Sequence, residues 1–152
     1  MDPVLVVVVN AVLALFGGGL LFIGIRSRRA AQASRAWSST QGTVDSSQVI
    51  TSGSNRSRWY KAQVTYTFTV NGQSYTSDKV FFGDARSSSM AKEQRVVDRY
   101  KAGAPVEVFY SPQQPQEAVL ERRTGGTTLV YLILGSVLLL MAGFVAVMGA
   151  TQ

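Results

Sequence analysis

The side chains in this sequence that could do acid–base chemistry are almost all carboxylates. The 152-residue chain has no His and no Cys, which excludes thiol nucleophiles, the usual zinc and haem sites, and the commonest general base. Asp78 and Asp84 flank the segment KVFFG and could share a cleft, as glycosidase or metal sites require. A solvated pair near strand ends is the preferred interpretation. We therefore expect no catalytic site, no metal and no cofactor. Between the apolar ends of the chain, the remaining carboxylates are Asp45, Glu93, Asp98, Glu107, Glu117 and Glu121.

Two further patterns could mark ligand sites, and each has a plainer explanation. The segment GDARSSSM could begin an anion-binding helix, although helix capping explains its serines equally well. Arg56, Arg58, Trp59 and Lys61 form the best basic and aromatic cluster for nucleic acid. The positive charge is concentrated beside the apolar segments, where lipid phosphates are the closer partner, so we expect no nucleic-acid binding.

Two long apolar segments enclose the charged part of the chain. Residues 4–25 contain no charge and one strongly polar residue, Asn10, and residues 127–150 contain no charge. A helix of about 22 residues rises roughly 33 Å, enough to cross a hydrocarbon core of about 30 Å. The alternative is two buried core helices, but the intervening residues could not wrap two helices that are apolar all round. We predict transmembrane helices over 4–25 and 127–150.

The basic residues predict how the chain lies in the membrane. All 15 Lys and Arg residues lie between the two apolar segments. Because basic residues near span ends stay on the cytoplasmic side, we expect a cytoplasmic central region and both termini outside. Asp2 at the start and arginines after the first segment argue against a cleaved signal peptide. Six basic residues crowd the span ends and are expected at lipid headgroups: Arg26, Arg28, Arg29, Arg35, Arg122 and Arg123.

The residues between the spans predict a juxtamembrane segment, 26–40, and a small α+β domain, 41–123. The first helix is expected to continue to about Ser39, followed by a strand over 42–50 and a loop over 51–57. Residues 60–70 alternate between apolar and polar side chains with a period of two, which predicts a half-buried strand.

Asn71 and Gly72 predict a hairpin, because a type I′ turn needs positive φ at both central residues. A two-residue turn pairs Phe68 with Tyr75 and Thr67 with Thr76. Continued unchanged, this register leaves Val80 and Phe82 outside the core. We therefore predict a one-residue bulge near residues 77–79 that returns both to the core.

A helix is predicted over 88–101, with Met90, Val97 and Tyr100 on its apolar stripe and Gly103 as its stop signal. The segment 104–110 alternates again, and 117–121 offers a last short strand. The predicted fold class is a membrane α+β protein, in which two transmembrane helices flank a small antiparallel β-sheet domain with one helix. The apolar stripe of that helix should cover the apolar face of the sheet.

Small residues in both spans predict helix–helix contact. Asn10, Ala14 and Gly18 recur every four residues in the first span, and Gly135, Ala142 and Gly149 recur every seven in the second. Small residues permit close approach in lipid, and a buried Asn can hydrogen-bond across the contact. The full predicted set is Asn10, Ala14, Gly18, Gly135, Ala142, Gly143, Ala146 and Gly149.

Several segments resemble one known family. They are Trp37 shortly before GTV at 42–44, the segment VTYTFTVNGQSY, and YKAGAPVEVFYSPQQPQEAVLE before the second span. Their order is similar to that of the DUF3592 family of bacterial membrane proteins. The resemblance implies two spans and one compact β domain, and it supplies no catalytic residues. The structural residues of the shared pattern are Trp37, Gly42, Tyr66, Asn71, Gly72, Tyr100, Gly103, Tyr110, Pro112 and Pro115.

These patterns predict a non-enzymatic membrane protein whose β-rich domain binds a protein partner, as an accessory, assembly or regulatory subunit. One concrete version is an immunity protein against a membrane-acting toxin. The alternative is an organiser of the membrane that binds anionic lipid or forms homo-oligomers through its spans. An enzyme acting on lipid is the third possibility, and it would depend on a carboxylate such as Asp78 or Asp84.

Overall fold

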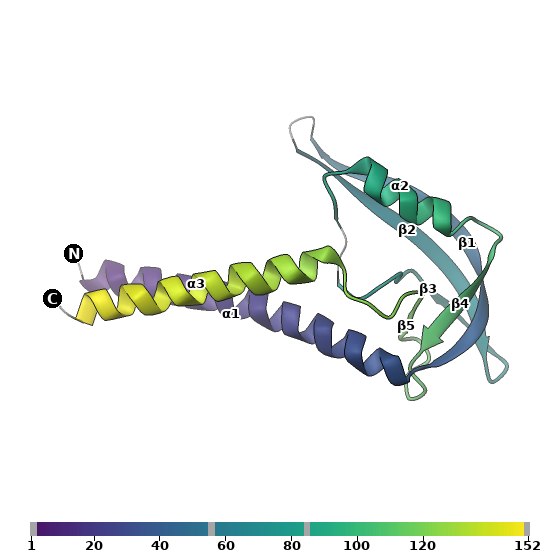
Figure 1. The fold of residues 1–152 in the computed structure, drawn as a ribbon, viewed down its shortest axis with the longest axis horizontal. Helices are drawn as coiled ribbons and strands as arrows, with labels where there is room; N and C mark the ends of the chain where they lie inside the picture. Colours follow the sequence, from purple (N-terminus) through teal and green to yellow (C-terminus); the bar gives the residue numbers. More distant parts are fainter. Residues whose placement is uncertain (1–2, 55–56, 84–85, 151–152) are drawn as a thin grey trace.

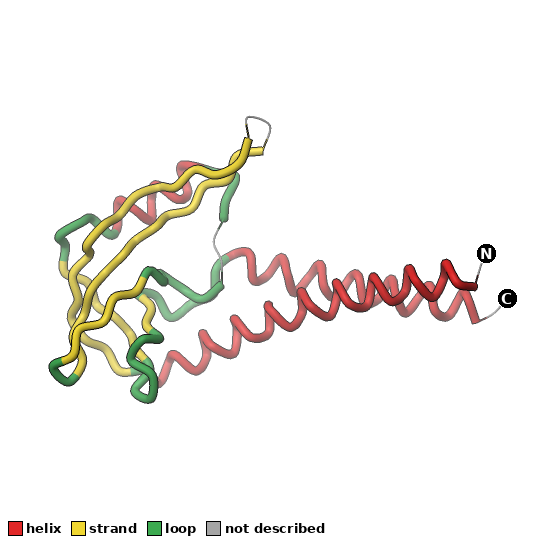
Figure 2. Tube along the Cα trace, turned by 180° about the vertical axis from the view of Figure 1, so that it is seen from behind, coloured by secondary structure: helices red, strands yellow, loops and turns green. Residues whose placement is uncertain are grey.

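The chain folds into two long helices joined to a sheet domain (Figure 1), and the computed structural model describes residues 3–54, 57–83 and 86–150. In chain order the elements are α1 (Pro3–Ala33), the 3-10 turn η1 (Ser34–Ala36), β1 (Ser38–Ser54), β2 (Ser57–Val70), β3 (Gln73–Ser77), α2 (Met90–Arg99), β4 (Pro105–Tyr110), β5 (Ala118–Val119) and α3 (Gly126–Ala150). Helices α1 and α3 lie side by side, with both chain ends at the end far from the sheet (Figures 1 and 2). This arrangement confirms the predicted fold class.

The five strands form one antiparallel sheet in the order β3-β2-β1-β4-β5. Strand β1 pairs with β4 only over residues 38–43, and β2 pairs with β3 only over residues 66–70. Residues 46–54 of β1 and 57–65 of β2 pair with each other beyond those limits. These two stretches, here called the ribbon, extend from the sheet as a two-stranded hairpin.

The hairpin between β2 and β3 confirms the sequence prediction. Asn71 has φ 51° and Gly72 has φ 81°, the positive values that a type I′ turn needs. Phe68 pairs with Tyr75 and Thr67 pairs with Thr76, so the register is the predicted one.

The bulge predicted near residues 77–79 is wrong, because β3 ends at Ser77 and the chain then leaves the sheet. Val80 still reaches the core, at 7% exposure, whereas Phe82 lies edge-on to Trp37 with ring centroids 5.6 Å apart. The register shift occurs in β1 instead, between Val44 and Ser46. An extra residue there exchanges the faces of β1, so that its core-facing residues change from even to odd numbers along the strand.

Two other element boundaries differ from the prediction. The first helix ends at Ala33 and β1 already begins at Ser38, so the helix does not reach Ser39. The predicted loop over 51–57 is mostly strand, because β1 runs to Ser54 and β2 starts at Ser57. Asn55 and Arg56 lie outside the described residues. Cross-strand pairing overrides the turn preference of these Ser, Thr and Gly residues.

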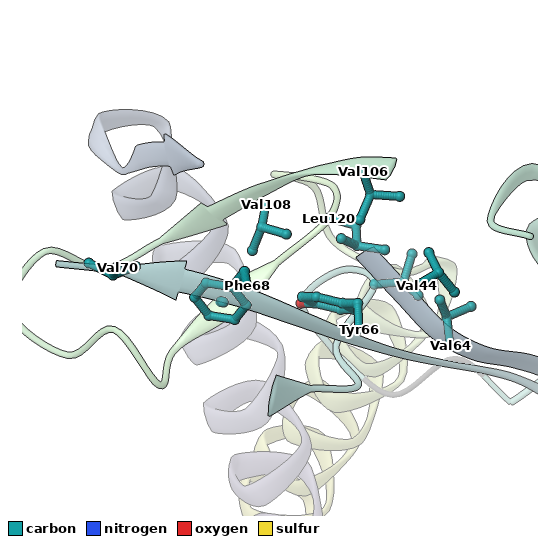
Figure 3. Packing of buried hydrophobic residues seen from close by; sticks show 10 residues of the cluster. Val44, Val64, Tyr66, Phe68, Val70, Val106, Val108 and Leu120 are labelled. Atoms are coloured by element: carbon teal, nitrogen blue, oxygen red, sulfur yellow. The ribbon is translucent and has the colours of Figure 1, made fainter. Parts of the chain in front are cut away.

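The domain core lies between the sheet and the segments that cover it (Figure 3). Val64, Tyr66 and Val108 are fully buried. The Tyr66 hydroxyl donates a hydrogen bond to the Lys79 carbonyl at 2.9 Å, which satisfies the one polar atom of that side chain. Burial raises the pKa of Tyr66 above its ordinary value. Phe68 stacks between Tyr75 and Tyr110, with ring centroids 5.8 and 6.4 Å away.

Helix α2 covers part of the sheet with a different stripe from the predicted one. Met90 is 53% exposed, so its assignment to the stripe is wrong. Tyr100 contacts the core as predicted, but its partner on the helix is Val96 rather than the half-buried Val97. Glu93 is only 3% exposed, and its carboxylate accepts a hydrogen bond from the Ala62 N–H at 3.0 Å. Because β3 does not extend this far along β2, other segments pair with this edge: Ser87 bridges to Tyr60, and Glu93 satisfies the Ala62 N–H.

Helices α1 and α3 are long and apolar enough to cross a membrane by length and composition. Only 6% and 11% of their most apolar stretches are buried, so they are not the core helices of a globular domain. Within the described residues, the large hydrophobic side chains that are exposed lie on α1 and α3, apart from Ile50, Trp59 and Met90.

Candidate functional site at the junction of the helices and the sheet

The contact between α1 and α3 is made by small residues and one amide. A Cβ added at Gly135 would lie 2.9 Å from the Gly17 carbonyl oxygen, so the two backbones touch at this point. In the orientation that satisfies both neighbours, the Asn10 amide donates to the Ala142 carbonyl at 2.6 Å and accepts from the Ala146 N–H at 3.3 Å. This is the close approach expected of membrane helices.

The small residues of α1 that make this contact differ in part from the predicted set. Asn10 is followed at intervals of seven by Gly17 and Gly24, and a Cβ at Gly24 would lie 2.7 Å from Leu132. Ala14 is exposed, and nothing lies within 4 Å of a Cβ placed at Gly18 or Gly143. On α3, Gly135, Ala142 and Gly149 lie on the contact face, the last with Val6 at 3.0 Å from its added Cβ.

The two loops where the sheet meets the helices are hydrogen-bonded to each other. The Phe82 N–H donates to the Arg123 carbonyl at 3.0 Å, and the Gly125 N–H donates to the Phe82 carbonyl at 2.8 Å. A Cβ at Gly125 would lie 2.8 Å from the Phe81 ring, so the glycine permits this approach. The segment that enters α3 is therefore fixed to the loop after β3.

Glu121 joins α2 to this segment. Its carboxylate pairs with Arg99 at 2.7 Å and with Arg123, and it accepts a hydrogen bond from the Tyr100 hydroxyl at 2.9 Å. Burial would raise the pKa of Glu121, but the hydrogen bonds from Arg123, Tyr100 and Arg99 outweigh it and the pKa lies below its ordinary value. Burial and the bond to Glu121 raise the pKa of Tyr100 to about 12.

Two of the arginines predicted at lipid headgroups, Arg122 and Arg123, are exposed and also make contacts within the protein. The Arg122 guanidinium lies 4.1 Å from the centre of the Phe109 ring and donates to the Arg35 carbonyl at 3.1 Å. Arg123 pairs with Glu121 and lies 4.3 Å from the centre of the Phe81 ring. Both residues therefore attach the segment that enters α3 to the sheet domain.

The other four predicted headgroup arginines, Arg26, Arg28, Arg29 and Arg35, are all exposed. In the described part of the chain, no ion pair involves any of their side chains. They follow the apolar part of α1 on its last turns and the 3-10 turn. Arg26 and Arg29 also border a cavity of about 920 Å³ between α1 and the sheet domain, whereas Arg28 and Arg35 do not.

The structure does not describe both members of the Asp78–Asp84 pair that the sequence suggests as a site. Asp78 is exposed beyond the end of β3, and Asp84 lies outside the described residues. Among the residues that the structure describes, no three carboxylates gather as metal ligands do. Ser89 occupies the N-cap position of α2 without a side-chain capping bond, and the Ser87 hydroxyl accepts from the Ser89 N–H.

One face of the ribbon carries apolar side chains in the open. Ile50 pairs with Lys61 and Ser52 pairs with Trp59, so Ile50 and Trp59 are diagonal neighbours on the same face. They are 37% and 47% exposed. The opposite face holds Ala62 and Val49, which α2 and its flanking loop adjoin.

The residues of the family pattern serve the fold. A Cβ at Gly42 would lie 2.8 Å from the Val108 side chain, which explains the glycine on this buried face. Gly103 has φ 81° and its N–H donates to the Val44 carbonyl at 2.7 Å. Trp37 contacts the Phe82 ring, and Tyr66, Tyr100 and Tyr110 belong to the core or pack against it. Asn71 and Gly72 form the hairpin turn, and Pro112 and Pro115 lie between β4 and β5.

The fold and the junction define a class of protein in which a sheet domain is held between two apolar helices. The family model described as a domain of unknown function, DUF3592, matches residues 40–125. The chain therefore belongs to the DUF3592 family. Neither the comparison with curated proteins nor the comparison with solved structures found a match.

Proposed function

We propose that this protein is an integral membrane protein of the bacterial inner membrane that works without catalysis, by binding a protein partner next to the bilayer. In this proposal α1 and α3 span the membrane, and the sheet domain is an accessory or regulatory module on the cytoplasmic side. An immunity protein against a membrane-acting toxin is one form that such a module could take.

The exposure of α1 and α3 supports membrane insertion. Their outward faces carry large apolar side chains along the whole length, including Leu15 at 75%, Leu140 at 74% and Phe144 at 67% exposure. Contiguous apolar surfaces of this size mark membrane or protein contacts. The basic residues between the helices support a cytoplasmic domain.

The Ile50–Trp59 pair is the observation that carries the partner-binding part. Trp is enriched among residues that dominate binding energies, and more than a third of each of these two side chains is exposed in the described structure. In both views the ribbon points back toward the side of the domain where the helices lie. Measured along the long axis of the molecule, it reaches about as far as the first turn of α3, although it lies to one side of that helix (Figures 1 and 2). A partner bound there would lie close to the membrane.

Affinity capture in mild detergent tests this surface. We expect a stoichiometric partner whose recovery falls at least tenfold in the double variant Ile50→Ser, Trp59→Ser. Met90→Ser is the control, because Met90 is the third exposed apolar residue of the domain and lies on α2. Equal recovery with all three proteins, or no partner at all, would refute the partner-binding role.

Cysteine labelling tests the orientation, since the natural chain has no Cys. Ser74 is exposed on β3, so Ser74→Cys should resist a membrane-impermeant maleimide in intact cells and react after lysis. Gln152→Cys should react in intact cells. The reverse pattern would place the domain outside and contradict the proposed topology.

A further inference from the structure

The cavity of about 920 Å³ lies on the side of α1 that faces away from α3. Gly24 contacts α3, and the lining residues Phe22, Arg26 and Ala33 are about 160–180° around the helix from it at 3.6 residues per turn. The opposite wall consists of Lys79, Phe82, Gly83, Glu117 and strand β5. The cavity is thus formed where α1 passes the sheet domain.

The lining changes from apolar to cationic along α1. Phe22 and Ile25 border the cavity at the end that belongs to the apolar segment, and both are exposed. Arg26 and Arg29 follow within the next turn, and Lys79 faces them from the domain. Trp37, which follows η1, also lines the cavity, and amphipathic rings favour the membrane–water boundary.

We propose that this cavity binds one anionic phospholipid, with its phosphate between Arg26, Arg29 and Lys79 and an acyl chain along Phe22 and Ile25. The inference depends on the membrane insertion proposed above but not on the partner. The lining holds three cations and a single carboxylate, Glu117. In the described chain none of the three cations forms an ion pair, so their charge is available to a ligand.

The continuous lining distinguishes a lipid from a soluble anion. A free phosphate would use the cations but would leave the apolar wall at Phe22 and Ile25 in water. A phospholipid covers both parts at once, because its headgroup and chains meet at the depth where the lining changes. A volume of this size lies in the range of ordinary ligand cavities.

The test compares two double variants of equal charge in nanodiscs that contain phosphatidylglycerol and phosphatidylcholine. Arg26→Gln, Arg29→Gln removes two cations from the cavity, and Arg28→Gln, Arg35→Gln removes two that do not line it. At about 1 kcal/mol for each basic residue near the surface, the first pair should weaken the preference for phosphatidylglycerol about 30-fold, measured by native mass spectrometry. The second pair should leave it within threefold.

Fluorescence gives a second readout at the cavity itself. The chain has two Trp residues, so Trp59→Phe leaves Trp37 as the only indole. Brominated phosphatidylglycerol should quench Trp37 more strongly than brominated phosphatidylcholine, and Arg26→Gln, Arg29→Gln should remove the difference. Soluble glycerol phosphate should not compete.

Three outcomes would overturn the site: equal loss in both double variants, no loss in either, or competition by glycerol phosphate. Each leaves membrane insertion intact. Failure of the natural chain to incorporate into nanodiscs at all would instead refute the proposed membrane protein. The two failures are therefore distinguishable.

Discussion

The sheet core and the helix contact are packed by opposite means within one chain. In the domain, large side chains such as Tyr66 and Phe68 fill the interior, and the Tyr66 hydroxyl is hydrogen-bonded. Between α1 and α3, glycines bring the backbones together against leucines such as Leu132 and Leu138, while many large side chains of both helices are exposed. Burying apolar surface stabilises a protein in water, but lipid gives no such gain, so in the proposed membrane protein close backbone contact would hold the helices together. The two kinds of packing therefore suit two different solvents.

The sharpest way to separate the regions is to remove the largest buried side chain of the sheet. Tyr66→Ala should lower the free energy of unfolding of the domain by about 3–5 kcal/mol, as for other buried aromatic residues. Denaturant titration followed by Trp fluorescence in micelles measures this. Tyr66→Phe keeps the ring and loses only the bond to the Lys79 carbonyl, so its cost should be about 1 kcal/mol.

At the contact between α1 and α3, a larger side chain rather than a smaller one should be destabilising. Gly17→Leu should cost about 1–3 kcal/mol, because a side chain at Gly17 meets the Gly135 carbonyl and Leu138 at 3.1 Å. Disulfide formation between Val6→Cys and Gly149→Cys reports the contact and should slow about tenfold. Gly18→Leu is the matched control, since Gly18 faces open space. Equal slowing in both variants would contradict the assigned contact face.

A buried acid stabilises the domain at the sheet edge. Glu93→Ala should cost about 1–3 kcal/mol because it leaves the Ala62 N–H without an acceptor. Glu93→Gln retains an oxygen acceptor and should recover most of the loss in the same denaturant titration. If the two variants lose the same stability, the hydrogen bond to Ala62 is not the cause.

Acid should weaken the junction before it weakens the helix contact. The pKa of Glu121 in the folded protein is below its ordinary value of 4.5, so its contribution is fully present above that pH and is lost as the pH falls through the folded-state pKa. Glu121→Gln should flatten the dependence of the unfolding free energy on pH below 4.5. An unchanged slope would assign the acid sensitivity to other carboxylates.

The smallest expected effect concerns the amide between the helices. Asn10→Leu should slow the Val6–Gly149 disulfide reaction only about threefold, since hydrogen bonds between membrane helices average about 0.6 kcal/mol. Ala14→Leu, on an exposed face of α1, should have no effect. A tenfold slowing of the disulfide reaction by Asn10→Leu would show that the amide, rather than the glycines, dominates the contact.

The sequence predicts the parts of this fold that depend on local pattern. The alternation over 60–70 and the Asn71-Gly72 turn give the β2–β3 register directly. The bulge was misplaced because Asp45 carries no local signal, and only pairing with β2 shows the extra residue. Residues 17–19 are all glycine, so composition does not show which of them lies on the contact face of α1. The interval of seven residues from Asn10 to Gly17 and on to Gly24 indicates that face.

The polar part of the site is harder to foresee. Glu93 and Glu121 look like solvated charges in the sequence, yet each accepts hydrogen bonds from elements distant along the chain. Arg122 and Arg123 look equivalent to Arg26 and Arg29, since all four border a span. Only the tertiary fold separates the pair held by Phe109, Phe81 and Glu121 from the pair that borders the cavity.

The interval of seven shared by α1 and α3 leaves their lengthwise alignment ambiguous. Sliding one helix by seven residues, roughly 10.5 Å, would again place small residues opposite each other. The two helices alone could therefore pack in more than one lengthwise alignment. The hydrogen bonds between the loop at Phe82 and the entry to α3 select one of them, so the sheet domain fixes the lengthwise position of the two helices and, in the proposed membrane protein, how far each would reach into the bilayer.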